Sequence, residues 1–383
     1  MYIKILSLAD SVAGALCLFV HGLFRKRKRS CPEKVDEIVV IKFLGYGSLI
    51  LAAPALYAIK RYYSDSRLVL CTTQSLQQHA GILKLFDDIT VLKPSCPLYS
   101  ILTLLKLRNR ISRSKTLIIN LEIFSKTAIF IAAFLRGCFC ATLADREYHN
   151  IDLTIRPETA AASTTAEMYD KMTAALGGKV DAGAYTEYLK DHYKTAEPQK
   201  QIIIAPFCSN LSLRRLWSCN KWSLLISQIR SDFPEYSIAL IGAASDRSSA
   251  QKIIEDSGVN SGIHNYCGEI SFGQTAELMR QSRCFCGIDS APLHMARLSA
   301  LPAVSLWGAT DPFLLTREIP GYPEVMIFAR QQCTPCVHND RKCPLPEGCL
   351  NTIDTNIVMT AVTDLIAGKI NTRKVSILDT ERL

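Results

Sequence analysis

Acidic, hydroxyl and imidazole side chains stand close together in the run from Asp289 to His294, which follows an apolar segment expected to be a strand. Asp289 or Ser290 suits the N-cap of a helix, and a proline in the first turn loses no hydrogen bond there. The amides of Ser290, Ala291 and Leu293 would then be free to bind an anion at the positive end of the helix dipole. His294 falls on the same helical face as Ser290. The run therefore predicts an anion site, although an ordinary capped helix with a core histidine fits this segment alone.

A turn of small residues follows the next expected strand. The segment Trp307 to Pro312 (WGATDP) offers the Thr310 hydroxyl and several backbone amides. Neighbouring parallel strands end at the same edge of a sheet, so this turn and the Asp289 run would approach one ligand. Taken alone, the segment predicts only a turn.

A group of cysteines lies late in the chain, at Cys333, Cys336, Cys343 and Cys349. The spacing is compatible with four thiolates around a structural zinc ion. The prolines among them also fit a rigid loop with reduced cysteines, or a redox-sensitive pair. Four cysteine ligands would close the coordination shell, so we expect no catalytic metal here.

Short apolar segments alternate with helix-length segments along most of the chain, and these elements must position the residues above. The first clear strand, Glu37 to Phe43, leads through the turn Gly45 to Ser48 into a helical stretch that ends near Tyr63. Similar units recur on both sides of a polar stretch at about 177–201. The alternation predicts α/β architecture, with parallel sheets covered by helices on both faces.

The 383 residues predict two domains. We expect an N-terminal Rossmann-like domain over residues 31–180 and a second over 181–365, which contains the cysteine-rich loop 333–349. Residues 366–383 are expected to form a C-terminal tail. Two such doubly wound domains would face each other across a cleft.

The net charge of +9 is concentrated near the N-terminus, because Arg25 to Arg29 is an unbroken basic run. The remainder is nearly balanced, which excludes the basic face of a nucleic-acid binder. The apolar segment Ile5 to Phe24 is about long enough to cross a bilayer, and the charge follows it, unlike in a cleaved signal peptide. We expect residues 1–30 to be a membrane anchor that spans the bilayer or lies in its interface, with a core helix as the alternative.

The motifs together resemble glycosyltransferase family nine, the heptosyltransferases of lipopolysaccharide synthesis. The similarity covers roughly residues 37 to 365 and rests on the segment Val39 to Lys60, the DSAPLH run from Asp289, the WGATDP turn and the cysteine group. The order of the last three motifs is the most specific part. The resemblance implies a GT-B fold, with acceptor in the N-terminal domain, nucleotide-sugar donor in the C-terminal domain, inversion at the anomeric carbon and no cofactor for catalysis.

The resemblance also implies roles for individual residues. Asp289, Ser290 and His294 match positions that bind the donor, with Ala291 and Thr310 beside them. The family has a lysine for the donor phosphates shortly before a tryptophan, and Arg215 stands there in this chain. Arginine keeps the charge and suits phosphate, although Arg214 and Arg215 also fit a solvated pair.

The first loop departs from the family pattern. There the family has Gly-Asp, with the aspartate as base for the acceptor hydroxyl, whereas this chain has Gly47-Ser48. We expect Gly45 and Gly47 to border the substrate, but a serine cannot take a proton at neutral pH unless a base activates it. Glu122, Asp145 or an acceptor phosphate is the alternative base, and a protein that binds donor but transfers poorly is a further alternative. In the second half, Asp246 falls near the family's acidic residue for the donor ribose.

The sequence thus predicts an inverting glycosyltransferase at the cytoplasmic side of the bacterial inner membrane. Its partners would be an ADP-heptose-like donor, a lipopolysaccharide-core or other lipid-linked glycan acceptor and the membrane surface. The main alternative is a nucleotide-sugar-binding member of the family with lost or altered transfer, because of Ser48. A sugar-nucleotide epimerase, which is also built from two such halves, is the third hypothesis.

Overall fold

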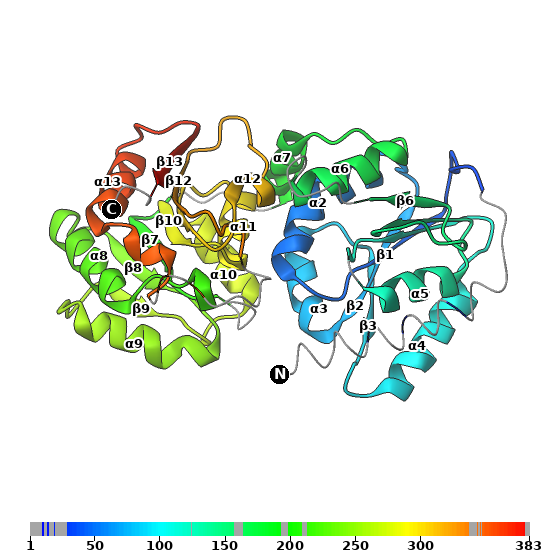
Figure 1. The fold of residues 1–383 in the computed structure, drawn as a ribbon, viewed down its shortest axis with the longest axis horizontal. Coiled ribbons are helices and arrows are strands. Elements are labelled where there is room, and N and C mark those ends of the chain that lie inside the picture. The colour runs from blue at the N-terminus through cyan, green and yellow to red at the C-terminus, as the bar shows by residue number, and fades with distance from the viewer. Residues whose placement is uncertain are drawn as a thin grey trace. The chain divides into compact units, whose positions relative to one another are not determined.

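The computed structural model describes residues 10, 14, 19, 29–123, 125–156, 164–192, 198–208, 213–336, 343, 345 and 347–379. The chain divides into two compact units, Met1–Tyr185 and Thr186–Leu383. Each contains a parallel sheet with helices on its faces (Figure 1). Helix α7 (Ala182–His192) runs across the division.

The first unit is built on a six-stranded parallel sheet in the order β3-β2-β1-β4-β5-β6. Its strands are β1 (Glu37–Ile41), β2 (Arg67–Thr73), β3 (Asp88–Leu92), β4 (Thr116–Asn120), β5 (Phe139–Leu143) and β6 (Leu153–Ile155). Its helices are α2 (Tyr46–Tyr62), α3 (Gln74–Ala80), α4 (Pro97–Arg110), α5 (Lys126–Leu135) and α6 (Thr165–Ala175).

The strand order of the first unit reverses between β1 and β4. Because parallel crossovers are right-handed, α2 and α3 lie on one face of the sheet and α4 and α5 on the other. Strands β4 and β5 are buried along their whole length, as expected for strands covered on both faces. The carboxyl ends of β1 and β4 therefore form a topological switch point, the usual place for a ligand in such sheets.

The second unit has a seven-stranded parallel sheet in the order β13-β12-β11-β10-β7-β8-β9. Its strands are β7 (Gln201–Ala205), β8 (Ser237–Leu240), β9 (Ile263–Asn265), β10 (Cys284–Ile288), β11 (Ala303–Trp307), β12 (Glu324–Arg330) and β13 (Arg373–Asp379). Its helices are α8 (Cys219–Asp232), α9 (Arg247–Asp256), α10 (Phe272–Arg280), α11 (Ala291–Leu298), α12 (Pro312–Leu315) and α13 (Thr355–Ile366). The switch point lies between β7 and β10.

The expected C-terminal tail is wrong in one respect. Residues 373–379 form β13, which pairs in parallel with β12 from Arg373 opposite Glu324 to Asp379 opposite Arg330. Two ion pairs with the buried Glu324 carboxylate, from Arg297 on α11 and Arg373 on β13, hold this edge. The last strand therefore belongs to the second unit.

The expected membrane anchor lies outside the described residues, apart from Asp10, Gly14 and Phe19. The Asp10 carboxylate accepts hydrogen bonds from the Ser125 hydroxyl at 2.9 Å and from the amides of Lys126 and Thr127 at 2.9 and 3.0 Å. Asp10 thus caps the N-terminus of α5, where a negative charge is favourable. Within the part of the chain that the structure describes, no helix is long and apolar enough to cross a bilayer.

Candidate functional site

The best-defined polar group lies at the switch point of the second unit. Asp289 directly follows β10, and Arg215 lies in the short 3-10 turn Leu213–Arg215 that follows β7. The Arg215 Nη1 atom donates a hydrogen bond to the Asp289 carbonyl oxygen at 2.9 Å and lies 3.8 Å from its carboxylate Oδ2. Two segments that are distant in sequence are therefore in direct contact through Arg215 and Asp289.

His294 completes the group from the first turns of α11. Its Nε2 atom lies 3.6 Å from Asp289 Oδ1, and both side chains are buried. Burial by itself raises the pKa of Asp289, but His294, Arg215 and Thr310 outweigh it, and the pKa lies below its ordinary value of 3.8. Asp289 is thus held as an anion that orients a cation and an imidazole.

Several buried polar atoms here make no hydrogen bond within the described part of the chain. They include the Ser290 Oγ, which does not cap α11 although Ser290 is its N-cap residue, and the His294 Nδ1. Buried polar groups are normally paired, so both atoms are available for a hydrogen bond to a polar ligand. The amide of Leu293, by contrast, already donates to the Ser290 carbonyl oxygen at 3.1 Å.

Cys208 and Asp246 lie at the same edge of the sheet. Burial raises the pKa of the Cys208 thiol, Arg215 lowers it, and the carboxylates of Asp289 and Asp246 raise it again. The charges of Arg215, Asp289 and Asp246 therefore all act on the Cys208 thiol. Asp246 is engaged locally, because its Oδ2 accepts a hydrogen bond from the Ala243 amide at 2.8 Å. The sequence analysis did not single out Cys208.

The turn after β11 contributes Thr310 to the polar group. The cysteine-rich loop forms hydrogen bonds with this turn. Thr310 is buried and helps to lower the pKa of Asp289, although its contact does not have hydrogen-bond geometry. The Thr334 hydroxyl donates to the Gly308 carbonyl oxygen at 2.9 Å, and the Cys336 amide donates to the Ala309 carbonyl oxygen at 2.9 Å. The loop thereby fixes the turn.

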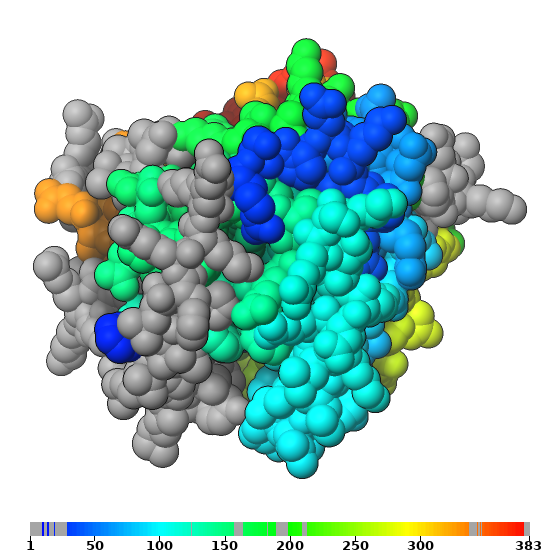
Figure 2. All heavy atoms as spheres, turned by 90° about the vertical axis from the view of Figure 1, so that its right-hand side faces the viewer, coloured from blue at the N-terminus to red at the C-terminus, as the bar shows by residue number. Residues whose placement is uncertain are grey.

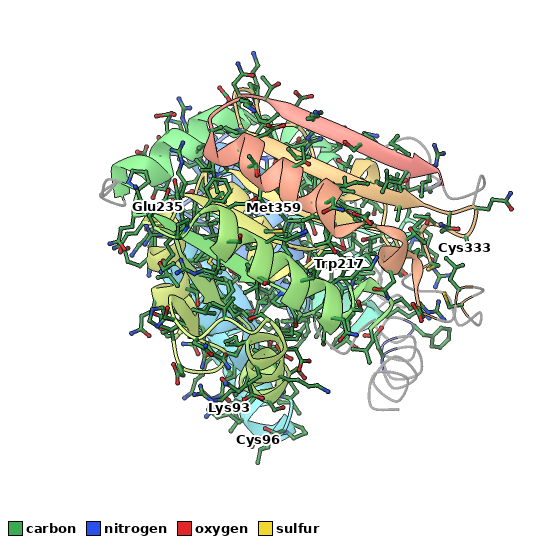
Figure 3. All side chains as sticks on the ribbon, turned by 90° about the vertical axis from the view of Figure 1, so that its left-hand side faces the viewer. Lys93, Cys96, Trp217, Glu235, Cys333 and Met359 are labelled. Carbon is green, nitrogen blue, oxygen red and sulfur yellow. The ribbon has the colours of Figure 1, made fainter. Side chains whose placement is uncertain are left out.

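The four predicted cysteine ligands gather in this loop. Cys336 and Cys349 are buried, whereas Cys333 is exposed at the outer end of the loop (Figure 3). Burial, with the neighbouring cysteines Cys336, Cys343 and Cys333, raises the pKa of Cys349 to about 11. In the described ranges, no three His, Cys, Asp or Glu side chains are arranged to hold a metal ion. The neighbouring cysteines therefore affect the Cys349 thiol electrostatically.

A second polar group lies at the switch point of the first unit. The Glu122 Oε1 accepts hydrogen bonds from the amides of Phe43 and Leu44 at 2.6 and 2.8 Å, and its Oε2 lies 3.1 Å from the Lys42 Nζ. Lys42 and Glu122 are both buried. Burial lowers the pKa of Lys42, and Glu122 offsets part of this effect. Glu122 thus holds the first loop against the end of β4.

The first loop is shorter than the sequence predicts, because α2 already begins at Tyr46 and includes Gly47 and Ser48. Gly45 has a φ of 77°, a left-handed conformation that favours glycine. The Ser48 hydroxyl donates to the Gly45 carbonyl oxygen at 2.7 Å. Tyr169, on α6, interacts with both Ser48 and Glu122, since both affect the pKa of its phenol.

The two alternative carboxylates for the first loop are in different environments. Glu122 is buried beside Lys42, whereas Asp145 is exposed beyond the end of β5. Lys42 and Tyr169 were missed by sequence reasoning. The position of Lys42 at the end of a buried strand could have drawn attention to it, but no local signal connects Tyr169 with a loop so distant in sequence.

Two doubly wound units, each with charged side chains at its switch point, define a two-domain Rossmann-like protein. Residues 160–345 match the family model of glycosyltransferase family 9 (heptosyltransferase). The chain thus resembles this family over these residues, which confirms the resemblance indicated by the motifs. It is also 26% identical, over 123 residues, to lipopolysaccharide heptosyltransferase 3 of Escherichia coli (strain K12). That alignment covers 32% of this chain and 33% of the relative. The chain therefore matches about a third of that relative's length.

Solved structures show the same fold. A family 9 glycosyl transferase from Veillonella parvula DSM 2008 has a TM-score of 0.67 at 16% identity, over 88% of this chain and 98% of that one. E. coli heptosyltransferase WaaC, solved with ADP, has a TM-score of 0.66 at 12% identity, over 86% of this chain and 99% of that one. The iron-containing dodecameric glycosyltransferase TibC of enterotoxigenic E. coli H10407 has a TM-score of 0.51 at 14% identity, over 89% and 78%. The predicted GT-B arrangement of two parallel α/β domains is confirmed.

Proposed function

We propose that the protein is an inverting glycosyltransferase that moves a heptose-like sugar from an ADP-linked donor to a lipopolysaccharide-core or other lipid-linked glycan. The observation that carries the proposal is the group formed by buried Asp289 and His294 with partly buried Arg215 at the switch point of the second unit. The Ser290 hydroxyl beside it is unpartnered among the described residues. The WaaC structure with ADP and the family 9 match support ADP as the nucleotide.

The transfer step requires stabilisation of the negative charge that develops on the diphosphate of the donor. The bond from the anomeric carbon to the diphosphate oxygen breaks, its electron pair leaves with the nucleotide, and the acceptor oxygen forms the new bond from the opposite face. The Arg215 guanidinium and the amino end of α11 stabilise the departing diphosphate. Asp289 keeps Arg215 and His294 in place.

The acceptor hydroxyl must lose a proton, and we assign Glu122 as the base. Its Oε1 is occupied by two amides, whereas its Oε2 faces the Lys42 ammonium and is the oxygen that receives the proton. Ser48 is already a hydrogen-bond donor to Gly45 and orients the loop. In this account Glu122 takes the role of the family's aspartate.

Replacing Glu122 with Gln tests the assignment. We expect kcat to fall at least about 100-fold with donor affinity unchanged, because general-base catalysis typically contributes about 10²–10⁴-fold. The measurement is steady-state transfer, with donor binding and the midpoint of thermal unfolding recorded for the same variant. Asp145→Asn is the matched control, and a loss in that variant alone would move the base to Asp145.

Incubation with labelled ADP-heptose and lipid extract separates the three functions. Label in the lipid fraction supports transfer. Label retained on the protein without transfer would favour the second candidate, a nucleotide-sugar-binding protein. That candidate rests on Ser48, which stands in place of the family aspartate. Conversion of the free donor would indicate an epimerase instead.

We also propose that the protein works at the cytoplasmic side of the bacterial inner membrane, with residues 1–30 at its surface. The contacts of Asp10 with the start of α5 support a segment that lies along the membrane interface over one that crosses the bilayer. Structural zinc at Cys333, Cys336, Cys343 and Cys349 stays a prediction. Metal analysis of the purified chain tests it, and zinc well below one equivalent would contradict it.

A further inference from the structure

Helix α4 of the first unit exposes most of its apolar side chains. It buries Leu107 against the sheet, with Leu104 partly buried beside it. The exposed apolar side chains are Leu98 (67% exposed), Tyr99 (43%), Ile101 (54%), Leu102 (51%) and Leu105 (41%). Figure 2 shows the helix lying on the surface of the molecule. A soluble protein rarely exposes such a run without a partner for it.

The exposed side chains form one stripe. At 3.6 residues per turn, Leu98, Leu102 and Leu105 share a face that points away from Leu107, with Ile101 on the same side. Tyr99 and Lys106 border the stripe on one side and Arg108 on the other. We call Leu98, Ile101, Leu102 and Leu105 the α4 stripe.

Every charged side chain in the sequence segment that carries the α4 stripe is a cation. No Asp or Glu stands between Asp88 and Glu122 in the sequence, whereas Lys or Arg occupies positions 93, 106, 108, 110, 113 and 115. Some of these cations have partners, since Arg110 pairs with Glu37 and Asp88 and Lys115 pairs with Asp36. Lys106 and Arg113 are exposed. An apolar stripe bordered by cations is typical of helices that lie in the interface of an anionic bilayer.

The neighbouring structure favours a bilayer over other occupants. A second copy of this chain would bring the same cations to the contact, and the apolar stripe does not suit a nucleic acid. Helix α4 contacts α5 through a cation–π pair, in which the Arg108 guanidinium lies 4.3 Å from the centre of the Phe134 ring. Asp10 caps that same helix α5.

We propose that α4 is a membrane-docking helix of this protein, whose stripe inserts below the headgroups of an anionic bilayer while Lys106 and Arg113 meet lipid phosphates. The proposal does not depend on sugar transfer. A chain that docks without transferring sugar, or transfers to a soluble acceptor without docking, separates the two.

A tryptophan at position 102 tests the proposal in the full chain. The native Trp217, Trp222 and Trp307 are buried, at 2%, 0% and 0% exposure, so they report little on lipid. We expect the Leu102→Trp variant to show blue-shifted emission with phosphatidylglycerol vesicles and a loss of emission when their acyl chains are brominated. Leu224→Trp is the matched control, since Leu224 on α8 is also 51% exposed, and it should respond to neither.

Several results would overturn the proposal. One is equal emission of Leu102→Trp with brominated and ordinary vesicles, whether or not the protein sediments with them, because the stripe would then not touch lipid. Another is a blue shift that grows with protein concentration in the absence of vesicles, because the stripe would then bind a second copy. When Ile101→Glu and Leu105→Glu are added to the Leu102→Trp variant, quenching of the tryptophan by brominated lipid should disappear. Persistent quenching would also contradict the proposal.

Discussion

At the scale of single residues, the site of the second unit depends on how a buried carboxylate is neutralised. Asp289 is nearly inaccessible to solvent, yet its pKa is lowered, because His294 and Arg215 supply more stabilisation than burial removes. The sequence motif named Asp289 and His294 as candidates. It could not show that Ser290 leaves its hydroxyl unpartnered within the described structure, since a serine at an N-cap normally bonds to the helix.

Arg215 is expected to contribute directly to turnover. Replacement by Ala removes a preorganised cation from the departing diphosphate, and we expect kcat to fall at least about tenfold. Arg215→Lys should retain part of the rate, because the charge remains while the planar fork is lost. Lys252→Ala, an exposed cation on α9, serves as the control. A wild-type rate in Arg215→Ala would remove Arg215 from the site.

The lowered pKa of Asp289 makes a prediction for stability against pH. A carboxylate whose folded pKa lies below 3.8 contributes stability above that pH and loses it as the pH falls through the folded value. Asp289→Asn should lower the free energy of unfolding by about 1–3 kcal/mol near neutral pH. The difference from wild type should shrink below about pH 4. Urea unfolding at several pH values measures it, and a difference that does not vary with pH would contradict it.

At the scale of elements, the alternation of strands and helices was readily predicted, but the boundaries and ends were not. The strand over Cys284–Ile288 and the helix after it follow from a buried run and a proline in the first turn. Strand β13 was missed because an edge strand of mixed composition, Arg373–Asp379, resembles a polar tail. Helix α2 begins earlier than expected because Gly45 adopts a left-handed conformation that starts the helix at once.

The contact between the WGATDP turn and the cysteine-rich loop yields a prediction at this scale. A Cβ atom at Gly308 would lie 2.3 Å from a Leu350 side-chain carbon and 2.5 Å from the Cys349 sulfur. We expect Gly308→Ala to destabilise the chain by about 1–3 kcal/mol through overpacking and to weaken donor binding. Gly273→Ala is the matched control, because a Cβ there meets nothing within 4 Å inside α10. Equal unfolding midpoints for the two variants would contradict the close packing.

At the scale of the whole molecule, length and alternation predicted two doubly wound units, and the relatives of known structure have the same fold. The proposed acceptor site was less predictable than the proposed donor site. Asp289, Ser290 and His294 follow one another in a short run, whereas Lys42, Glu122 and Tyr169 come from three distant segments that only folding brings together. The specific sugar and acceptor depend on pocket shape, which spacing in a sequence does not encode.

Hydrogen–deuterium exchange of the intact chain, with and without saturating ADP, tests most directly whether the second unit holds the donor nucleotide. Amides bound to a phosphate exchange more slowly, and a ligand that binds the folded state also suppresses local opening. We predict slower exchange in peptides that contain Asp289 to His294 and in those that contain Arg215. Protection confined to the first unit, or exchange unchanged by ADP throughout, would contradict the account.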